Sequence, residues 1–103
     1  MKVQLFSIFD KKARTYSAPF TCLQHGEAIR MMQIQLEREP EGMHAKYAED
    51  FELWFLGEFD QSDASFDLEF KPEPVIRFDA LVERKQHGRE REDVSDSGVG
   101  SGG

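Results

Sequence analysis

One stretch of the chain, residues 51–59, alternates so regularly that it constrains the fold more than any other segment. Its sequence, FELWFLGEF, predicts a strand, because side chains along a strand point alternately to two faces. One face collects the apolar residues Phe51, Leu53, Phe55 and Phe59. The other face collects Glu52, Trp54, Leu56 and Glu58. Such a strand predicts a sheet with a covering layer on its apolar face.

Four further segments have the composition of strands. Residues 3–9, VQLFSIF, carry β-branched and aromatic residues on both faces, which is typical of a central strand. Residues 15–20 predict a second strand that completes an opening hairpin and lies at an edge, because Pro19 lacks a donor. Residues 66–70 alternate with one polar face, and residues 75–82 predict a last strand.

A helix is expected between the second and third strands. The apolar residues that share one helical face are Ala28, Ile29, Met32 and Leu36, and Pro40 with Gly42 ends the pattern. The sequence therefore predicts one α+β domain over residues 1–82, in the order ββαβββ, with a mostly antiparallel sheet packed by one main helix. Residues 83–103 are charged and then rich in glycine and serine, which predicts a disordered tail.

Charge is distributed unevenly along the chain, whose formal net charge is −7. Residues 1–38 contain six bases and three acids, whereas residues 39–83 contain three bases and thirteen acids. Overall acidity argues against indiscriminate coating of nucleic acid, because affinity for phosphate comes mostly from Lys and Arg. A basic face on the first third is compatible with this distribution, and so is a simply solvated surface.

The sequence does not predict an enzyme. Cys22 and His25 have the spacing of two metal ligands, but no second pair follows, so we expect neither a metal nor another cofactor. The carboxylates after residue 39 alternate with apolar residues, as on a solvated sheet face. A lone cysteine, no apolar run that could span a membrane and no signal-peptide pattern predict a cytosolic protein.

Binding is the better prospect, and the candidate nucleic-acid-binding residues are Lys11, Lys12, Arg14, Tyr16 and Arg30. Proteins that bind single-stranded DNA without sequence preference combine cations with aromatic rings on which bases stack. In the competing interpretation the neighbouring phenylalanines are core and the lysines decorate a turn. Trp54 is expected to be half-buried under the helix. A second class of function, protein–protein interaction through exposed strand edges, remains open.

Several short motifs, in order, resemble a known viral family. The segments FSIFDKKA at residues 6–13, GEAIR at 26–30 and AEDFELWFLGEFD at 48–60 are similar to the small nonstructural protein of gokushoviruses. These viruses are tailless microviruses that infect bacteria and carry circular single-stranded DNA. The resemblance covers roughly residues 1–60, where Gly57 suggests a bulge or close packing and Ala28 a close helix–sheet contact.

The resemblance implies a DNA-binding nonstructural protein, made in the cytoplasm of the infected bacterium and absent from the virion. It implies a part in genome replication, or in the switch to single-strand synthesis and packaging. A dimer that places two basic hairpins together would reconcile this role with the acidic chain. The alternative is an adaptor or regulator that acts on phage or host replication proteins without touching DNA.

Overall fold

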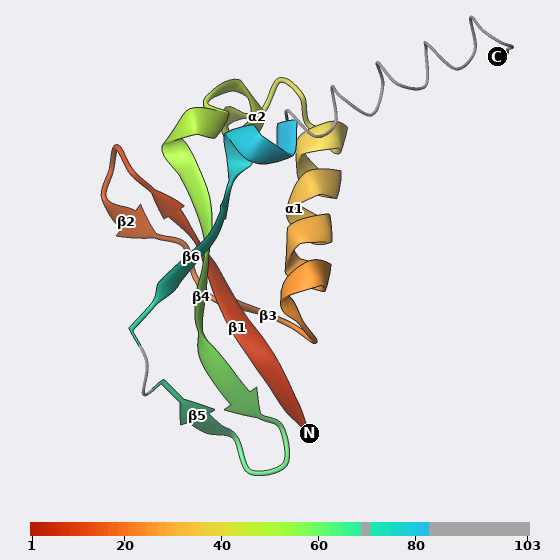
Figure 1. Ribbon diagram of the computed structural model, residues 1–103, viewed down its shortest axis with the longest axis vertical. Coiled ribbons are helices and arrows are strands. Elements are labelled where there is room, and N and C mark those ends of the chain that lie inside the picture. Colours follow the sequence, from red (N-terminus) through yellow and green to blue (C-terminus); the bar gives the residue numbers. More distant parts are fainter. Residues whose placement is uncertain (69–70, 83–103) are drawn as a thin grey trace, which may run out of the picture.

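Two long antiparallel strands form the centre of the molecule (Figure 1). The structure is a computed structural model that describes residues 1–68 and 71–82. Strand β1 (Lys2–Asp10) pairs with β4 (Phe51–Asp60) from Lys2 opposite Asp60 to Asp10 opposite Phe51. The central position predicted for residues 3–9 is thus confirmed, and the strand predicted at residues 51–59 is its central neighbour.

Short strands flank this β1–β4 ribbon on both edges. Beside β1 lie β2 (Thr15–Tyr16) and β3 (Phe20–Cys22), and beside β4 lie β5 (Ser65–Asp67) and β6 (Glu73–Arg77). All of these pairings are antiparallel. The six-stranded sheet with helices confirms the predicted α+β class.

The predicted strand over residues 15–20 is broken in two. Ser17 occupies the break: its hydroxyl accepts a hydrogen bond from the backbone N–H of Ile8 at 2.9 Å. The buried hydroxyl of Ser7 donates to the carbonyl oxygen of Ser17 at 2.7 Å. Pro19 lies in the same break and has no N–H for a ladder. In the break between β2 and β3, these side-chain hydrogen bonds therefore take the place of regular pairing with β1.

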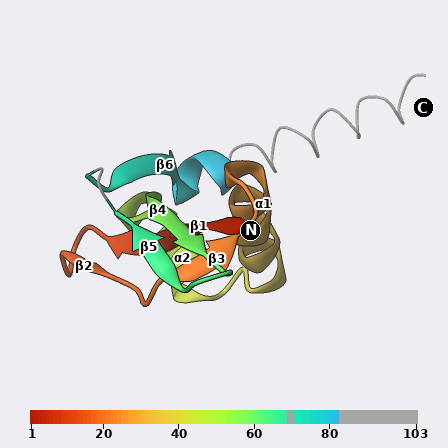
Figure 2. The ribbon, with the colours of Figure 1, turned by 90° about the horizontal axis from the view of Figure 1, so that it is seen from below.

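One face of the ribbon is covered by helices. Helix α1 (His25–Arg38) is followed by the short α2 (Met43–Lys46) and the 3-10 turn η1 (Ala48–Asp50). Figure 2 shows α1 beside the ribbon, on the side away from β2. The residues with which these helices enter the core are Ala28, Met32, Leu36 and Ala48. Ala28 has no exposed surface, which confirms the close helix–sheet contact predicted there.

A bulge in β4 changes which side chains share a face. Leu5 pairs with Gly57 and the next residue, Phe6, pairs with Phe55, so Leu56 is an extra residue in β4. Phe55 pairs with Phe6 and faces the helices. Phe59 lies two residues after Gly57, the partner of Leu5, and therefore shares the opposite face with Leu5. The prediction that Phe59 shares the face of Phe55 is therefore wrong.

Gly57 is required at this bulge. Its φ of +148° belongs to a region that L side chains rarely adopt. A Cβ built on it would lie 2.4 Å from the carbonyl oxygen of Asp67 and 2.6 Å from a methyl of Leu68. The end of β5 lies directly against β4 at this point, so the close packing predicted for Gly57 is confirmed.

The predicted last strand, residues 75–82, is only half correct. Strand β6 ends at Arg77, and residues 78–82 are helical. Phe78 and Leu81 are three residues apart and are 0% and 1% exposed, a spacing that a helix turns toward one side and a strand does not. No helix of the described residues is long and apolar enough to cross a membrane. The predicted tail, residues 83–103, lies outside the described residues.

Candidate nucleic-acid interface

The turn between β1 and β2 is built around Asp10. Its Oδ1 accepts the backbone N–H of Lys12 at 3.0 Å and of Ala13 at 3.1 Å, while its carbonyl oxygen accepts the N–H of Arg14 at 2.7 Å. Arg14 adopts the left-handed conformation, with φ 59°. These contacts satisfy the backbone of the turn without the side chains of Lys11, Lys12 and Arg14. All three side chains are exposed at its tip.

Three aromatic rings lie together behind this tip. Phe9 packs against Tyr16 with ring centroids 4.6 Å apart, and Trp54 stands edge-on to each of them at 5.6 Å. We call Phe9, Tyr16 and Trp54 the ring cluster. The neighbour of Trp54 in β4, Leu53, is fully buried in the core, so the ring cluster lies on the other face of the sheet. Trp54 is half-buried as predicted, but not under the helix.

Glu52 connects the ring cluster to the turn. Its Oε1 accepts the indole N–H of Trp54 at 2.9 Å, and its Oε2 lies 3.8 Å from Nζ of Lys11. One carboxylate thus orients the tryptophan and offsets part of the Lys11 charge. Within residues 1–68 and 71–82, no ion pair involves Lys12 or Arg14. The tip therefore offers two unpaired cations and one that is shared with Glu52.

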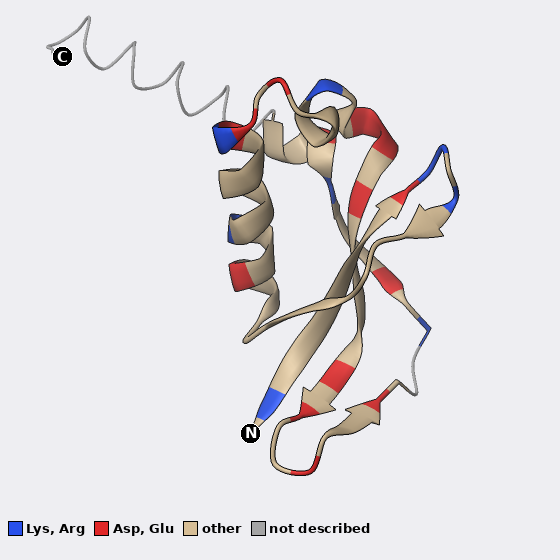
Figure 3. Cartoon of the chain, turned by 180° about the vertical axis from the view of Figure 1, so that it is seen from behind, with Lys and Arg blue, Asp and Glu red and all other residues tan. Residues whose placement is uncertain are grey.

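Arg30 does not join this group. It lies on the exposed side of α1, and Figures 1 and 2 place α1 and the β1–β2 hairpin on opposite sides of the ribbon. Of the five residues predicted from sequence, the structure brings Lys11, Lys12, Arg14 and Tyr16 to one hairpin. Figure 3 shows this basic hairpin at one end of the ribbon and the acidic β4–β5 hairpin at the other.

A shallow groove lies beside the tip, on its helix side. The residues that line this groove are Asp10, Lys12, Met43, Tyr47, Asp50 and Phe51. Met43 is 63% exposed and Tyr47 is 52% exposed, although both are large apolar side chains. Lys12 thus lines a groove that also contains the aromatic rings of Tyr47 and Phe51.

The candidate residues predicted from sequence do not include three of these. Phe9 is one of the neighbouring phenylalanines that the competing interpretation places in the core, Trp54 is expected under the helix, and Tyr47 has no predicted role. The position of the first two follows from the alternation of side chains along a strand. Phe9 is next to Ile8 and Trp54 is next to Leu53, and because Ile8 and Leu53 pack in the core, Phe9 and Trp54 point to the other face. Tyr47 carried no signal, because only the turn between α2 and η1 brings it to the hairpin.

The residues considered for catalysis have structural partners. Burial, together with the nearby carboxylate of Glu27, raises the pKa of the Cys22 thiol, whose Sγ lies 3.3 Å from Sδ of Met31. A thiol held protonated is a poor nucleophile. His25 Nδ1 lies 2.7 Å from Oε1 of Gln4. No group of three or more metal-binding side chains occurs among the described residues.

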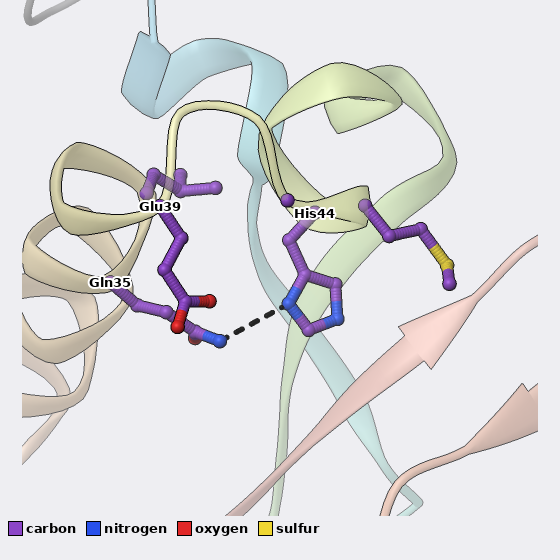
Figure 4. A pocket seen from close by; sticks show the side chains of 6 residues that line it. Gln35, Glu39 and His44 are labelled. Atoms are coloured by element: carbon purple, nitrogen blue, oxygen red, sulfur yellow. Dashed lines mark hydrogen bonds between the residues drawn. The ribbon is translucent and has the colours of Figure 1, made fainter.

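A second pocket lies between α1 and α2, around His44 (Figure 4). The amide nitrogen of Gln35 is hydrogen-bonded to His44 Nδ1 at 3.3 Å. The imidazole also packs edge-on against Phe51 at 4.6 Å and Phe78 at 5.6 Å. Because the partner of His44 is an amide and its ring contacts the core, this histidine joins α2 to the sheet.

The fold and site define a small α+β protein with a basic, aromatic hairpin at one end. The sequence profile of the Phage ORF5 protein family matches residues 3–81. The chain belongs to this family and is a phage protein. No curated protein and no solved structure matches it.

Proposed function

We propose that this phage protein binds single-stranded DNA through the β1–β2 hairpin and performs no catalysis. The observation that carries the proposal is the position of Lys12 and Arg14, which are exposed and without an ion pair among the described residues, at the tip of the hairpin that carries Phe9 and Tyr16 of the ring cluster. Cations attract the phosphates, and rings provide faces on which unpaired bases stack, whatever their identity. Single strands satisfy both requirements because their bases are accessible.

The overall acidity of the chain is compatible with this proposal, because the acidic β4–β5 hairpin is far from the basic β1–β2 hairpin. Strand β1 has nine residues, so the two hairpins stand about 30 Å apart along the ribbon. The Debye length at physiological salt is about 8 Å, so the acidic hairpin is screened from a strand bound at the basic one. Repulsion at the acidic end confines DNA to the β1–β2 hairpin.

The proposal includes a setting. A protein that holds single strands acts where the genome is copied, in the cytoplasm of the infected bacterium and outside the virion. Its role there is in replication of a single-stranded genome of the gokushovirus type, or in the switch to single-strand synthesis and packaging. Membership of a phage family and the chemistry of the hairpin support this setting.

The test is fluorescence anisotropy of a labelled single-stranded oligonucleotide, titrated with the protein at several salt concentrations. Three phosphate contacts predict a slope of log affinity against log salt of about −2 for a single strand. Substitution of Lys11, Lys12 and Arg14 by Ala is expected to abolish binding and flatten the slope, with an unchanged circular dichroism spectrum. Affinity that survives this triple substitution in a folded protein would exclude the hairpin as the site.

A second candidate function rests on the other end of the molecule. Phe66 and Leu68 are 60% and 55% exposed beside the acidic turn. An exposed apolar pair in an acidic surround suits a basic, apolar segment of another protein. The chain would then act as an adaptor for phage or host replication proteins. Absence of DNA binding at low salt, with capture of a replication protein that Phe66→Ser abolishes, would favour this function.

A further inference from the structure

The solvent side of α1 carries an apolar stripe that the fold covers only in part, through a contact of 3.3 Å between the sulfur atoms of Met31 and the buried Cys22 of β3. Met31 is 44% exposed and Ile34 is 39% exposed, while Ala28, Met32 and Leu36 on the inward face are buried. A surface helix normally places charged and polar residues on its solvent side. Leu23, 51% exposed just before the helix, extends the same stripe.

The stripe has the spacing of a helix-pairing seam. Glu27, Met31, Ile34 and Arg38 follow one another at intervals of four, three and four residues. This alternation is the a/d pattern with which one helix packs along another. The seam lies about half a turn away from the core-facing Leu36, so it is on the opposite side of α1 from that residue, with Met31 touching Cys22 at the edge of the sheet. A shallow groove beside it is lined by Met31, Ile34, Gln35, Arg38 and Glu39.

We propose that this seam binds a second copy of the chain, with the two α1 helices antiparallel. A two-fold axis midway between Met32 and Gln33 places Met31 against Ile34 of the other copy, and Ile34 against its Met31. The same axis places Glu27 opposite Arg38, twice. The seam is thus complementary to itself in charge and in apolar character.

Charge selects the antiparallel orientation over the parallel one. In a parallel pair each Glu27 would meet Glu27 and each Arg38 would meet Arg38, and like charges across a seam destabilise pairing. Glu27 is exposed in the first turn of α1, where its Oε1 accepts the N–H of Leu23 at 2.7 Å and its carboxylate lies near the Cys22 thiol. Arg38 is exposed in the last turn of α1.

The seam is short, which determines the strength of the dimer. Two apolar residues per copy, with Leu23 at the end, bury less than the ~800 Å² per partner of a standard interface. We therefore expect a reversible dimer in the micromolar range. Because α1 lies on the side of the ribbon away from β2, the dimer leaves both basic hairpins free. Its existence is therefore independent of DNA binding.

Sedimentation velocity of the full chain, from low micromolar to near-millimolar concentrations, tests the proposal. The native protein is expected to shift from monomer to dimer across this range. Arg38→Glu is expected to weaken the dimer about tenfold or more, because Glu27 of each copy would then face a carboxylate of the other copy in place of Arg38. The double variant Glu27→Arg with Arg38→Glu reverses both charges and is expected to restore dimerisation.

Lys12→Glu provides the matched control, with the same sign of charge change in the β1–β2 hairpin, on the side of the ribbon away from α1. It is expected to leave the monomer–dimer equilibrium nearly unchanged. Circular dichroism of each variant confirms that α1 remains folded. A native chain that stays monomeric throughout overturns the proposal. So does a dimer that Arg38→Glu leaves unchanged, as a parallel pair would require, because position 38 would there face its own copy and like charges would still meet.

Discussion

The two hairpins at the ends of the ribbon share one construction and differ in charge. In each, a Phe and an Asp precede four turn residues, and the strand resumes with a hydroxyl residue and an aromatic ring. Asp60 repeats the role of Asp10: its Oδ1 accepts the N–H of Ser62 at 2.9 Å and its carbonyl oxygen that of Ala64 at 2.8 Å. Ala64 has φ 61°, matching the 59° of Arg14.

The aromatic pairs behind the two turns also correspond. Phe9 faces Tyr16 across β1 and β2, and Phe59 faces Phe66 across β4 and β5, with centroids 4.6 and 4.9 Å apart. The turn residues, however, are KKAR in one hairpin and QSDA in the other. Since both sets support the same backbone, the fold does not require the three cations. We therefore attribute the three cations to the function of this hairpin and not to its folding.

The largest effect is expected at Gly57, where the end of β5 packs closely against β4. Gly57→Ala introduces a Cβ into the carbonyl oxygen of Asp67 at an unfavourable φ, and is expected to destabilise the fold by about 2–4 kcal/mol. The equivalent position in the first hairpin is Ser7. Ser7→Ala removes only its hydroxyl contacts with Ser17 and is expected to cost about 1 kcal/mol. Urea unfolding measures both; equal losses would contradict the comparison.

The rings behind the turns are expected to differ in function. Tyr16→Ala removes the most exposed member of the ring cluster and is expected to weaken single-strand binding by about 1–2 kcal/mol, roughly tenfold. Phe66→Ala, at the corresponding position of the acidic hairpin, is expected to leave affinity unchanged. Trp54, the one tryptophan of the chain, gives an independent fluorescence signal for DNA at the cluster. Equal losses in the two variants would indicate a general effect on folding.

The left-handed residue of each turn separates stability from binding. Arg14→Gly and Ala64→Gly each relieve the cost of a positive φ and are expected to stabilise the protein by about 0.5–1 kcal/mol. Only Arg14→Gly removes a cation, so only this variant is expected to bind DNA more weakly. Thermal unfolding and anisotropy on the same two samples provide the measurement. Weaker binding in both variants would contradict the assignment.

The smallest effect concerns pH at the acidic turn. Hydrogen bonds from the hydroxyl and the backbone N–H of Ser62 lower the pKa of Asp60 below its usual value. Its contribution to stability is therefore present above the unfolded pKa, about 3.9, and is lost as pH falls through the lower folded value. Ser62→Ala is expected to raise the pKa of Asp60, measured by an NMR titration of its carboxyl. No movement would show that the hydroxyl is not the cause.

Much of the fold was predictable from sequence, because local pattern and tertiary role agree in β1, β4 and α1. The failures have specific causes. Phe59 lies on the other face because the extra residue Leu56 reverses the alternation of side chains between the two faces of β4. The backbone conformation of Gly57, which the sequence does not show, marks this bulge. Residues 78–82 became helical because Phe78 and Leu81 bury on one side, a spacing too short to distinguish from a strand in sequence.

The candidate site was predictable in its charges and not in its rings. Lys11, Lys12 and Arg14 stand in a polar turn, so their exposure followed from the hairpin pattern. The face of Trp54 depended on which side of the ribbon α1 covers, a matter of packing. The correspondence of the two hairpins was also invisible in sequence, because in the aligned segments of residues 9–16 and 59–66 only the initial Phe and Asp are identical. The shared turn geometry reveals it.

Exchange of the turn residues tests the central claim most directly. Lys11→Gln, Lys12→Ser, Ala13→Asp and Arg14→Ala give the basic hairpin the residues of the acidic one, which already support the same turn. Anisotropy with a single-stranded oligonucleotide at low salt is the measurement. The account predicts a folded protein, within about 1 kcal/mol of native stability, whose affinity falls about tenfold or more. A folded variant that binds DNA as tightly as the native chain would contradict the account.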